Sequence, residues 1–160
     1  MAMRAGIGYD IHARATGRPL VLGGVRFETD WGLDGHSDAD VLAHAIGDAL
    51  LGAASLGDLG HHFPPDDEKW RNVSSLKLLR LIRALLDGRG ARIINVDATV
   101  VAAEPKLAPA RDAMRENLAR ALKLAGGSVS VKATTNESLD ALGRGEGIAA
   151  WAIAMVEVAD

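Results

Sequence analysis

The segment from Gly147 to Ala159 would be apolar on both faces if it formed a β-strand. Successive side chains of a strand point to opposite sides of its sheet. One side would carry Ile148, Ala150, Ala152, Ala154 and Val156, and the other Ala149, Trp151, Ile153 and Met155. Both faces should therefore be buried. One can pack on helices. The other is covered either by the same chain, as in the central strand of a monomer, or by another subunit, and the pattern alone fits both.

The rest of the chain mixes strand and helix patterns without strict alternation, which favours an α+β fold. We expect a single domain over residues 3–159, with a mixed β-sheet and helices packed on one face. Strands are expected over 4–12, 19–22, 25–27, 93–103, 129–135 and 147–159. Helices are expected over 37–54, 75–87 and 109–125, the first with a capping box made by Ser37 and Asp40.

Composition excludes several classes of protein. No apolar run is long enough to span a bilayer, and the start of the chain does not resemble a secretory signal, so we expect a cytoplasmic protein with no membrane partner. The net charge is −3 with the basic residues dispersed, which argues against nucleic acid as a main partner. There are no cysteines, so any bound metal must be held by imidazole and carboxylate groups.

All five histidines fall within the first 62 residues, which makes this part of the chain the place to look for a site. Asp10 and His12 lie two residues apart on an expected strand, so both face the same way. A carboxylate and an imidazole on one face suit zinc or a similar ion, with a further ligand from elsewhere. An Asp-x-His sequence alone is common and indicates little.

The expected first helix offers that further ligand. Asp40, His44 and Asp48 are spaced four residues apart and form a polar line on an otherwise apolar helix. Burying such groups unpaired costs roughly 1–3 kcal/mol each. Metal coordination by His44, or hydrogen bonds among the three, would explain the line. Asp38 and Asp40 also fit a simpler role as helix-start residues.

Two later regions carry further candidates. The loop from Gly57 to Asp67 could fold over a substrate, although its His61 and His62 fit solvated side chains and its Asp58 fits a turn. In the second half, the run Thr134-Thr135-Asn136-Glu137 ends a strand with groups suited to phosphate and a hard cation. Lys106 follows Pro105 at another strand end. Arg144 could bind phosphate or simply pair with Glu146.

Taken in order, these segments resemble the signature blocks of the 2-C-methyl-D-erythritol 2,4-cyclodiphosphate synthase family of the non-mevalonate isoprenoid pathway. The resemblance runs from about Met3 to Val158. The blocks are Asp10-Ile11-His12, His36-Ser37-Asp38-Ala39-Asp40, His44, 48–53, 56–60, Lys132-Ala133-Thr134-Thr135 and 143–149.

The resemblance implies a phosphorus–oxygen lyase that converts 4-diphosphocytidyl-2-C-methyl-D-erythritol 2-phosphate to the 2,4-cyclodiphosphate and CMP. It implies a homotrimer with active sites between subunits. By position, Asp10, His12 and His44 would hold one Zn²⁺ per subunit, and Glu137 would help place Mg²⁺ or Mn²⁺ on the substrate diphosphate. His36 and Thr135 would stabilise the transition state.

The resemblance also implies the groups that bind substrate. The methylerythritol part would contact Ser37, Asp58, Gly60, Phe63 and Asp67, next to Asp10, His12 and His36. The cytidine diphosphate would contact Ala102, Pro105, Lys106, Ala108, Thr134, Thr135, Asn136 and Glu137, and Arg144 is a further substrate-binding candidate. Two other functions remain open from the residues alone: a zinc phosphohydrolase with a similar ligand set, and a non-catalytic oligomeric binding module.

Overall fold

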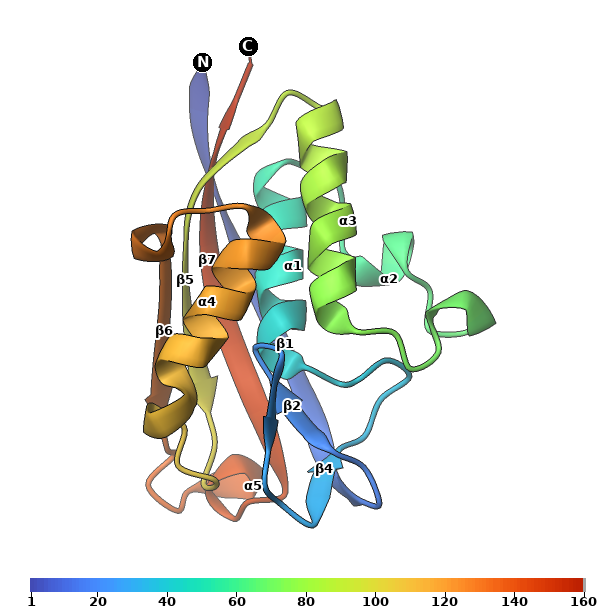
Figure 1. Ribbon diagram of the computed structural model, residues 1–160, viewed down its shortest axis with the longest axis vertical. Coiled ribbons are helices and arrows are strands. Elements are labelled where there is room, and N and C mark those ends of the chain that lie inside the picture. The colour runs from blue at the N-terminus through green and yellow to red at the C-terminus, as the bar shows by residue number, and fades with distance from the viewer. Residues whose placement is uncertain (160) are drawn as a thin grey trace.

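A five-stranded mixed sheet forms the centre of the computed structural model, which describes residues 1–159 (Figure 1). Its strand order is β4-β1-β7-β5-β6, in which β7 runs antiparallel to both β1 and β5, and β5 and β6 are parallel. A separate hairpin pairs β2 with β3. The strands are β1 (Ala2–Thr16), β2 (Leu20–Leu22), β3 (Val25–Phe27), β4 (Trp31–Leu33), β5 (Arg92–Val101), β6 (Val129–Thr134) and β7 (Gly147–Val158).

The helices cover one face of this sheet, as expected for the α+β class (Figure 1). Helix α1 lies directly on β1 and β7, α3 packs beside α1, and α4 packs on β6. Their bounds are α1 (Val41–Ala53), α3 (Ser75–Gly88) and α4 (Arg111–Leu122), with the short α2 (Leu59–His62) and α5 (Asp140–Gly143) in connecting loops. Within residues 1–159, none of the helices combines the length and apolar character that crossing a membrane requires.

Strand β7 lies in the middle of the sheet, and its two faces have different surroundings. Ala150, Ala152 and Ala154 are buried under α1. On the opposite face Trp151 is 42 % exposed and Ile153 is 53 % exposed. The prediction of a central strand with two apolar faces is confirmed, but on the second face this chain buries Ala149 and leaves Trp151 and Ile153 exposed.

Small residues let α1 approach the sheet closely. Gly6 and Gly8 of β1 face the helix backbone at Ala45 and Ala49, and a Cβ atom on either glycine would collide with it. Ala45 and Ala49 are themselves fully buried. The contact works because neither surface carries a side chain larger than a methyl group here, so helix and strand backbones touch. This close contact sets the position of every side chain on α1 relative to β1.

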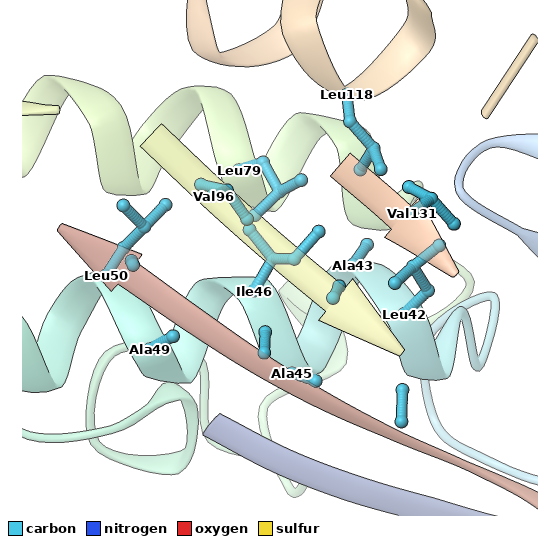
Figure 2. Close-up of a cluster of buried hydrophobic side chains, with 14 of the residues drawn as sticks. Leu42, Ala43, Ala45, Ile46, Ala49, Leu50, Leu79, Val96, Leu118 and Val131 are labelled. Carbon is cyan, nitrogen blue, oxygen red and sulfur yellow. The ribbon is translucent and has the colours of Figure 1, made fainter. Parts of the chain in front are cut away.

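Larger apolar side chains fill the space between α1 and its other neighbours. Leu42, Ile46 and Leu50 of α1 are fully buried and meet side chains from the other helices and the far strands (Figure 2). Those partners include Leu79, Val96, Leu118 and Val131. Helix α1 is thus buried on nearly all sides, which explains why its few polar residues each have a specific partner.

The predicted start of the first helix was wrong. The helix begins at Val41 rather than Ser37, and Asp40 is its N-cap, so Ser37 and Asp40 form no capping box. The Asp40 carboxylate is completely buried and accepts hydrogen bonds from the backbone N–H groups of Gly23, Gly24 and Ala43. Asp40 therefore joins the β2–β3 turn to α1 and does not share a site with His44. Burial raises its pKa.

The observed boundaries of several other elements differ from the predicted ones, because a short helix or strand has too few residues to show a clear periodic pattern. Strand β1 extends well beyond the expected 4–12, and α4 is shorter at both ends than the expected 109–125. Strand β4 spans only three residues and gave no sequence signal, yet it forms the edge of the sheet next to β1. Helices α2 and α5, of four residues each, fall in regions expected to be loops.

The close contact between α1 and β1 predicts a large effect for a very small substitution. Gly8→Ala should lower the free energy of unfolding by about 1–3 kcal/mol, because the added methyl group meets the Ala45 carbonyl and cannot be accommodated without moving the helix. Urea unfolding measures this. Gly88→Ala is the control, since a Cβ there meets nothing within 4 Å. Equal stability of Gly8→Ala and wild type would contradict the contact.

Candidate metal and substrate site

Three side chains from β1 and α1 converge on one point. Asp10 Oδ2 lies 2.9 Å from His12 Nε2 and 3.0 Å from His44 Nδ1, and the two ring nitrogens are 3.3 Å apart. The alternation of β1 turns Asp10 and His12 toward α1, and the close packing of α1 brings His44 to them. Within residues 1–159, these three form the one group of His and acidic side chains close enough to hold a metal ion.

The spacing of the three atoms fits a metal ion. Ligands bound at about 2.0–2.1 Å in a tetrahedral zinc site lie about 3.3–3.4 Å apart. The observed separations are slightly shorter, so a single point can lie at bonding distance from all three atoms, with a fourth position open toward the adjacent cavity. Asp10, His12 and His44 each offer one lone pair to that point.

Asp10 and His12 each stabilise the charged form of the other. Burial alone raises the pKa of the Asp10 carboxyl, but hydrogen bonds and charge attraction from His12 and His44 outweigh it and lower the pKa to about 2. For His12, burial lowers the pKa, and the contacts with Asp10 and with the Asp34 carbonyl reverse that effect and raise it. Asp10 therefore stays ionised at neutral pH and attracts positive charge, whether a proton or a cation.

A cavity of about 240 Å³ opens beside the three ligands. It contains His36, Ser37, Gly60 and Phe63, which the sequence marked as site residues. The His36 Nε2–H donates to the Asp67 carbonyl at 3.1 Å, so Asp67 contributes its backbone to the position of His36. Residues that the sequence did not mark also line the cavity: Asp48, Leu59, Pro65, Trp70, Val73 and Leu78.

Several predicted residues near this cavity have structural partners. Asp58 is the N-cap of α2 and accepts from the His61 N–H at 2.9 Å, in line with the alternative of a turn-forming residue. Asp67 caps the turn at Glu68–Trp70. His61 is exposed as expected, but His62 is half-buried and donates from its ring to the Leu56 carbonyl at 2.7 Å, so the expectation of a solvated His62 was wrong.

A second cavity of about 220 Å³ gathers most of the other predicted residues. It is lined by Ala102, Pro105, Lys106, Leu107, Ala108, Arg111, Ala133, Thr134 and Thr135. Asn136 instead donates to Asp140 at 3.0 Å, and Arg144 pairs with Glu146 at 2.6 Å, as the alternative for Arg144 anticipated. Glu137 is exposed in the turn after β6 and is not part of the group formed by Asp10, His12 and His44.

The two cavities lie at the same end of the sheet but on different strands. Ala150 of β7 pairs with Asp10 of β1 on one side and with Val100 of β5 on the other. Two strand spacings amount to roughly 10 Å, and β6 adds a further spacing. The cavities are lined by different residues throughout the described chain.

Two polar side chains to which the sequence analysis assigned no site role, Arg18 and Asp48, hold the segments of this site together. The Arg18 guanidinium donates to the carbonyls of Gly35 and Ser37, which fixes the segment that carries His36 and Ser37. Asp48 accepts from the Leu59 N–H at 2.8 Å and so attaches α2 to α1. Burial raises the pKa of Asp48, and the N–H of Leu59 opposes that shift. Asp48 was visible as part of the polar line on the helix, whereas Arg18 gave no such signal.

The fold and these three residues define an α+β protein with a candidate metal site. A model of the YgbB family matches residues 3–157. The chain is 56 % identical over 153 residues to the 2-C-methyl-D-erythritol 2,4-cyclodiphosphate synthase of Synechococcus elongatus, a match that covers 96 % of each chain. It is 59 % identical over 151 residues to a bifunctional IspD/IspF enzyme of Anaeromyxobacter, covering 94 % of this chain and 39 % of that one.

Solved structures agree with these relatives. The bifunctional IspDF of Campylobacter jejuni has a TM-score of 0.95 at 41 % identity, over 99 % of this chain and 43 % of that one. IspF of Plasmodium falciparum in a CDP complex has a TM-score of 0.86 at 31 % identity, over 99 % and 98 %. The chain therefore belongs to the YgbB family, the family of the 2-C-methyl-D-erythritol 2,4-cyclodiphosphate synthases. It is a phosphorus–oxygen lyase of isoprenoid biosynthesis.

The geometry predicts that metal binding depends on three specific side chains. Asp10→Asn, His12→Ala and His44→Ala should each reduce the divalent metal retained after dialysis from about one ion per chain to a small fraction, because each removes one of three converging ligands. Elemental analysis by mass spectrometry measures it. His61→Ala is the matched control, since His61 is exposed and outside the group. Unchanged metal content in all three variants would exclude this site.

Proposed function

We propose that this chain catalyses the ring closure of 4-diphosphocytidyl-2-C-methyl-D-erythritol 2-phosphate. An oxygen of the 2-phosphate attacks the β-phosphorus, the bond from the β-phosphorus to the bridging oxygen breaks, and CMP leaves with that oxygen. The products are 2-C-methyl-D-erythritol 2,4-cyclodiphosphate and CMP. The observation that carries the proposal is the group formed by Asp10, His12 and His44 at the edge of a cavity, in a chain of this family.

Zinc is the proposed ion at the group of three, one per subunit, because two imidazoles and one carboxylate with an open fourth position are typical of catalytic zinc. A divalent ion there would neutralise and orient phosphate oxygens, which repel one another strongly in this substrate. We further propose that Glu137 helps to place Mg²⁺ or Mn²⁺ on the diphosphate, since exposed carboxylates suit these harder cations.

The remaining roles follow from the two cavities. In the first, Ser37, Gly60 and Phe63, with Asp58 and Asp67 nearby, are proposed to hold the methylerythritol part. In the second, the backbone and side chains of the lining are proposed to hold cytidine diphosphate: Ala102, Pro105, Lys106, Ala108, Thr134 and Thr135, with Asn136, Glu137 and Arg144 at its margin. Two solved relatives carry bound CDP, which supports a nucleotide cavity in this fold.

His36 and Thr135 are the proposed groups that stabilise the transition state. His36 is half-buried at the first cavity with its Nε2–H directed to the Asp67 carbonyl, so its ring orientation is fixed. Thr135 lines the second cavity, where its Oγ1 also accepts from the Glu137 N–H. The attacking group belongs to the substrate, so the protein supplies position and charge rather than a nucleophile.

The substrate requires both cavities at once, and this requirement supports an assembly of several chains. A homotrimer is proposed, with the first cavity of one subunit beside the second cavity of its neighbour. The uncovered sheet face is the surface proposed to form the interface. Ile7 pairs with Ile153, and Tyr9 pairs with Trp151 at a ring distance of 4.7 Å, and all four side chains are exposed in the single chain. Contiguous apolar patches of this kind mark interaction sites.

A cytoplasmic location and a single domain over residues 3–159 remain predictions.

The mass in solution tests the assembly. Three chains of 16.8 kDa give about 50 kDa by light scattering. Ile153→Glu places a charge in the middle of the apolar face and should shift the protein to about 17 kDa and abolish turnover. Leu85→Glu changes an exposed leucine on α3 and should leave mass and turnover unchanged. A wild-type species near 17 kDa would exclude the trimer.

The reaction itself is tested by product analysis. With the cytidylylated 2-phosphate substrate, zinc and magnesium, the protein should release CMP and a cyclic diphosphate in equal amounts, and His44→Ala should lower the rate by a factor of at least about 100. Phosphorus NMR and chromatography identify the products. Inorganic phosphate in place of CMP would support a phosphohydrolase, and absence of turnover would support a binding module.

A further inference from the structure

Ser75 is a completely buried polar residue at the start of α3, and its hydroxyl faces the metal ligand His44. Its Oγ lies 2.8 Å from Nε2 of His44, the ring nitrogen opposite the one that faces Asp10 and His12. Ser75 lines neither cavity, so it reaches the site through His44 and through Asp38, which lies in the loop that also carries His36 and Ser37.

The direction of this hydrogen bond is determined by Asp38. The Ser75 Oγ–H donates to Oδ1 of Asp38, and the Ser75 backbone N–H donates to Oδ2 at 2.9 Å. A carboxylate only accepts, and a hydroxyl has a single proton. Because that proton is committed to Asp38, the Ser75 oxygen can only accept from His44, and this contact favours a ring proton on Nε2 of His44.

The position of the ring proton of His44 also determines whether Nδ1 has a free lone pair. A neutral imidazole with its proton on Nε2 has a lone pair on Nδ1. His44 Nδ1 lies 3.0 Å from Asp10 Oδ2 and 3.3 Å from His12 Nε2, where a lone pair binds an ion and a proton would block it. The Asp10 carboxylate can only accept a hydrogen bond, so in the metal-free site it favours a proton on Nδ1 and opposes the effect of Ser75. Metal-binding histidines usually depend on such an outer partner for their tautomer.

Ser37 offers an opposing arrangement. Its Oγ lies 3.1 Å from the same Nε2 and accepts from the Ala39 N–H at 3.2 Å. The hydroxyl proton of Ser37 is therefore able to point to Nε2, which would favour the tautomer with the proton on Nδ1. Ser75 with Asp38 therefore opposes both Asp10 and Ser37 in setting the position of the ring proton.

We propose that Asp38 and Ser75 act together as positioning residues that hold His44 in the Nε2–H tautomer and so prepare Nδ1 for the metal ion. The proposal deepens the proposed metal site and rests on it. The two residues lie far apart in the chain, Asp38 in the loop before α1 and Ser75 at the start of α3. The hydrogen bonds from Ser75 to Asp38, which join α3 to this loop, thus also influence which nitrogen of His44 carries the ring proton.

The tautomer can be measured directly in the metal-free protein. Long-range proton–nitrogen correlation spectra of histidine-labelled protein, at a pH where the ring is neutral, distinguish the two tautomers, and His44→Ala assigns the signals. The wild type should show a substantial population of Nε2–H at His44, despite the opposing contact with Asp10. Ser75→Ala should increase the population of Nδ1–H and weaken zinc binding roughly 10–100-fold in a chelator competition. Ser75→Thr retains the hydroxyl and should restore both.

Ser74→Ala is the matched control, because Ser74 is the neighbouring N-cap residue and makes no side-chain capping bond. It should change neither the tautomer nor the affinity. Absence of Nε2–H at His44 in the wild type would overturn the proposal without any variant, as would an unchanged tautomer ratio or unchanged zinc affinity in a folded Ser75→Ala. The spectra need no substrate, so a failure of the proposed reaction gives a separate result.

Discussion

The site depends on the direct contact between the backbones of α1 and β1. Gly6 and Gly8 leave no room for a Cβ atom beneath the helix, and Ala45 and Ala49 complete the contact from the helix side. His44 directly precedes Ala45, and Asp10 and His12 follow Gly8 on the same strand face. A helix displaced by the width of one methyl group would open the 3.0 Å gap between Asp10 and His44 beyond bonding reach. The close packing of α1 on β1 therefore also determines the spacing of Asp10, His12 and His44.

Carboxylates around the candidate metal site connect neighbouring segments of the chain. Hydrogen bonds to Asp40 join the β2–β3 turn to α1, and a hydrogen bond to Asp48 joins α2 to α1. Asp38 accepts a hydrogen bond that joins α3 to the loop before α1. Each carboxylate is at least partly buried and accepts backbone N–H groups, so each joins two segments that apolar packing alone would leave free to slide. Among the acidic residues of this region, Asp10 belongs to the candidate metal site, whereas Asp38, Asp40 and Asp48 connect segments of the structure.

The sequence predicted the fold class and the group of three because both rest on strong periodicity. Alternation placed Asp10 beside His12, and helical spacing placed His44 on a polar line. Spacing also placed Asp40 on that line, but the alternative of a helix-start residue is the correct one for Asp40, because the helix begins at Val41 with Asp40 as its N-cap. Ser75, Arg18 and strand β4 escaped prediction because their roles arise from contacts with distant segments. The sequence also predicted a covered second face of β7, which a single chain leaves exposed at Trp151 and Ile153.

Anomalous diffraction at the zinc absorption edge tests the central claim most directly. Crystals of the zinc-loaded protein should give one strong peak per chain, about 2.0–2.1 Å from Oδ2 of Asp10, Nε2 of His12 and Nδ1 of His44, with the fourth direction open to the cavity that contains His36 and Ser37. A zinc peak elsewhere, or well-ordered side chains of these three residues with no peak between them, would contradict the account.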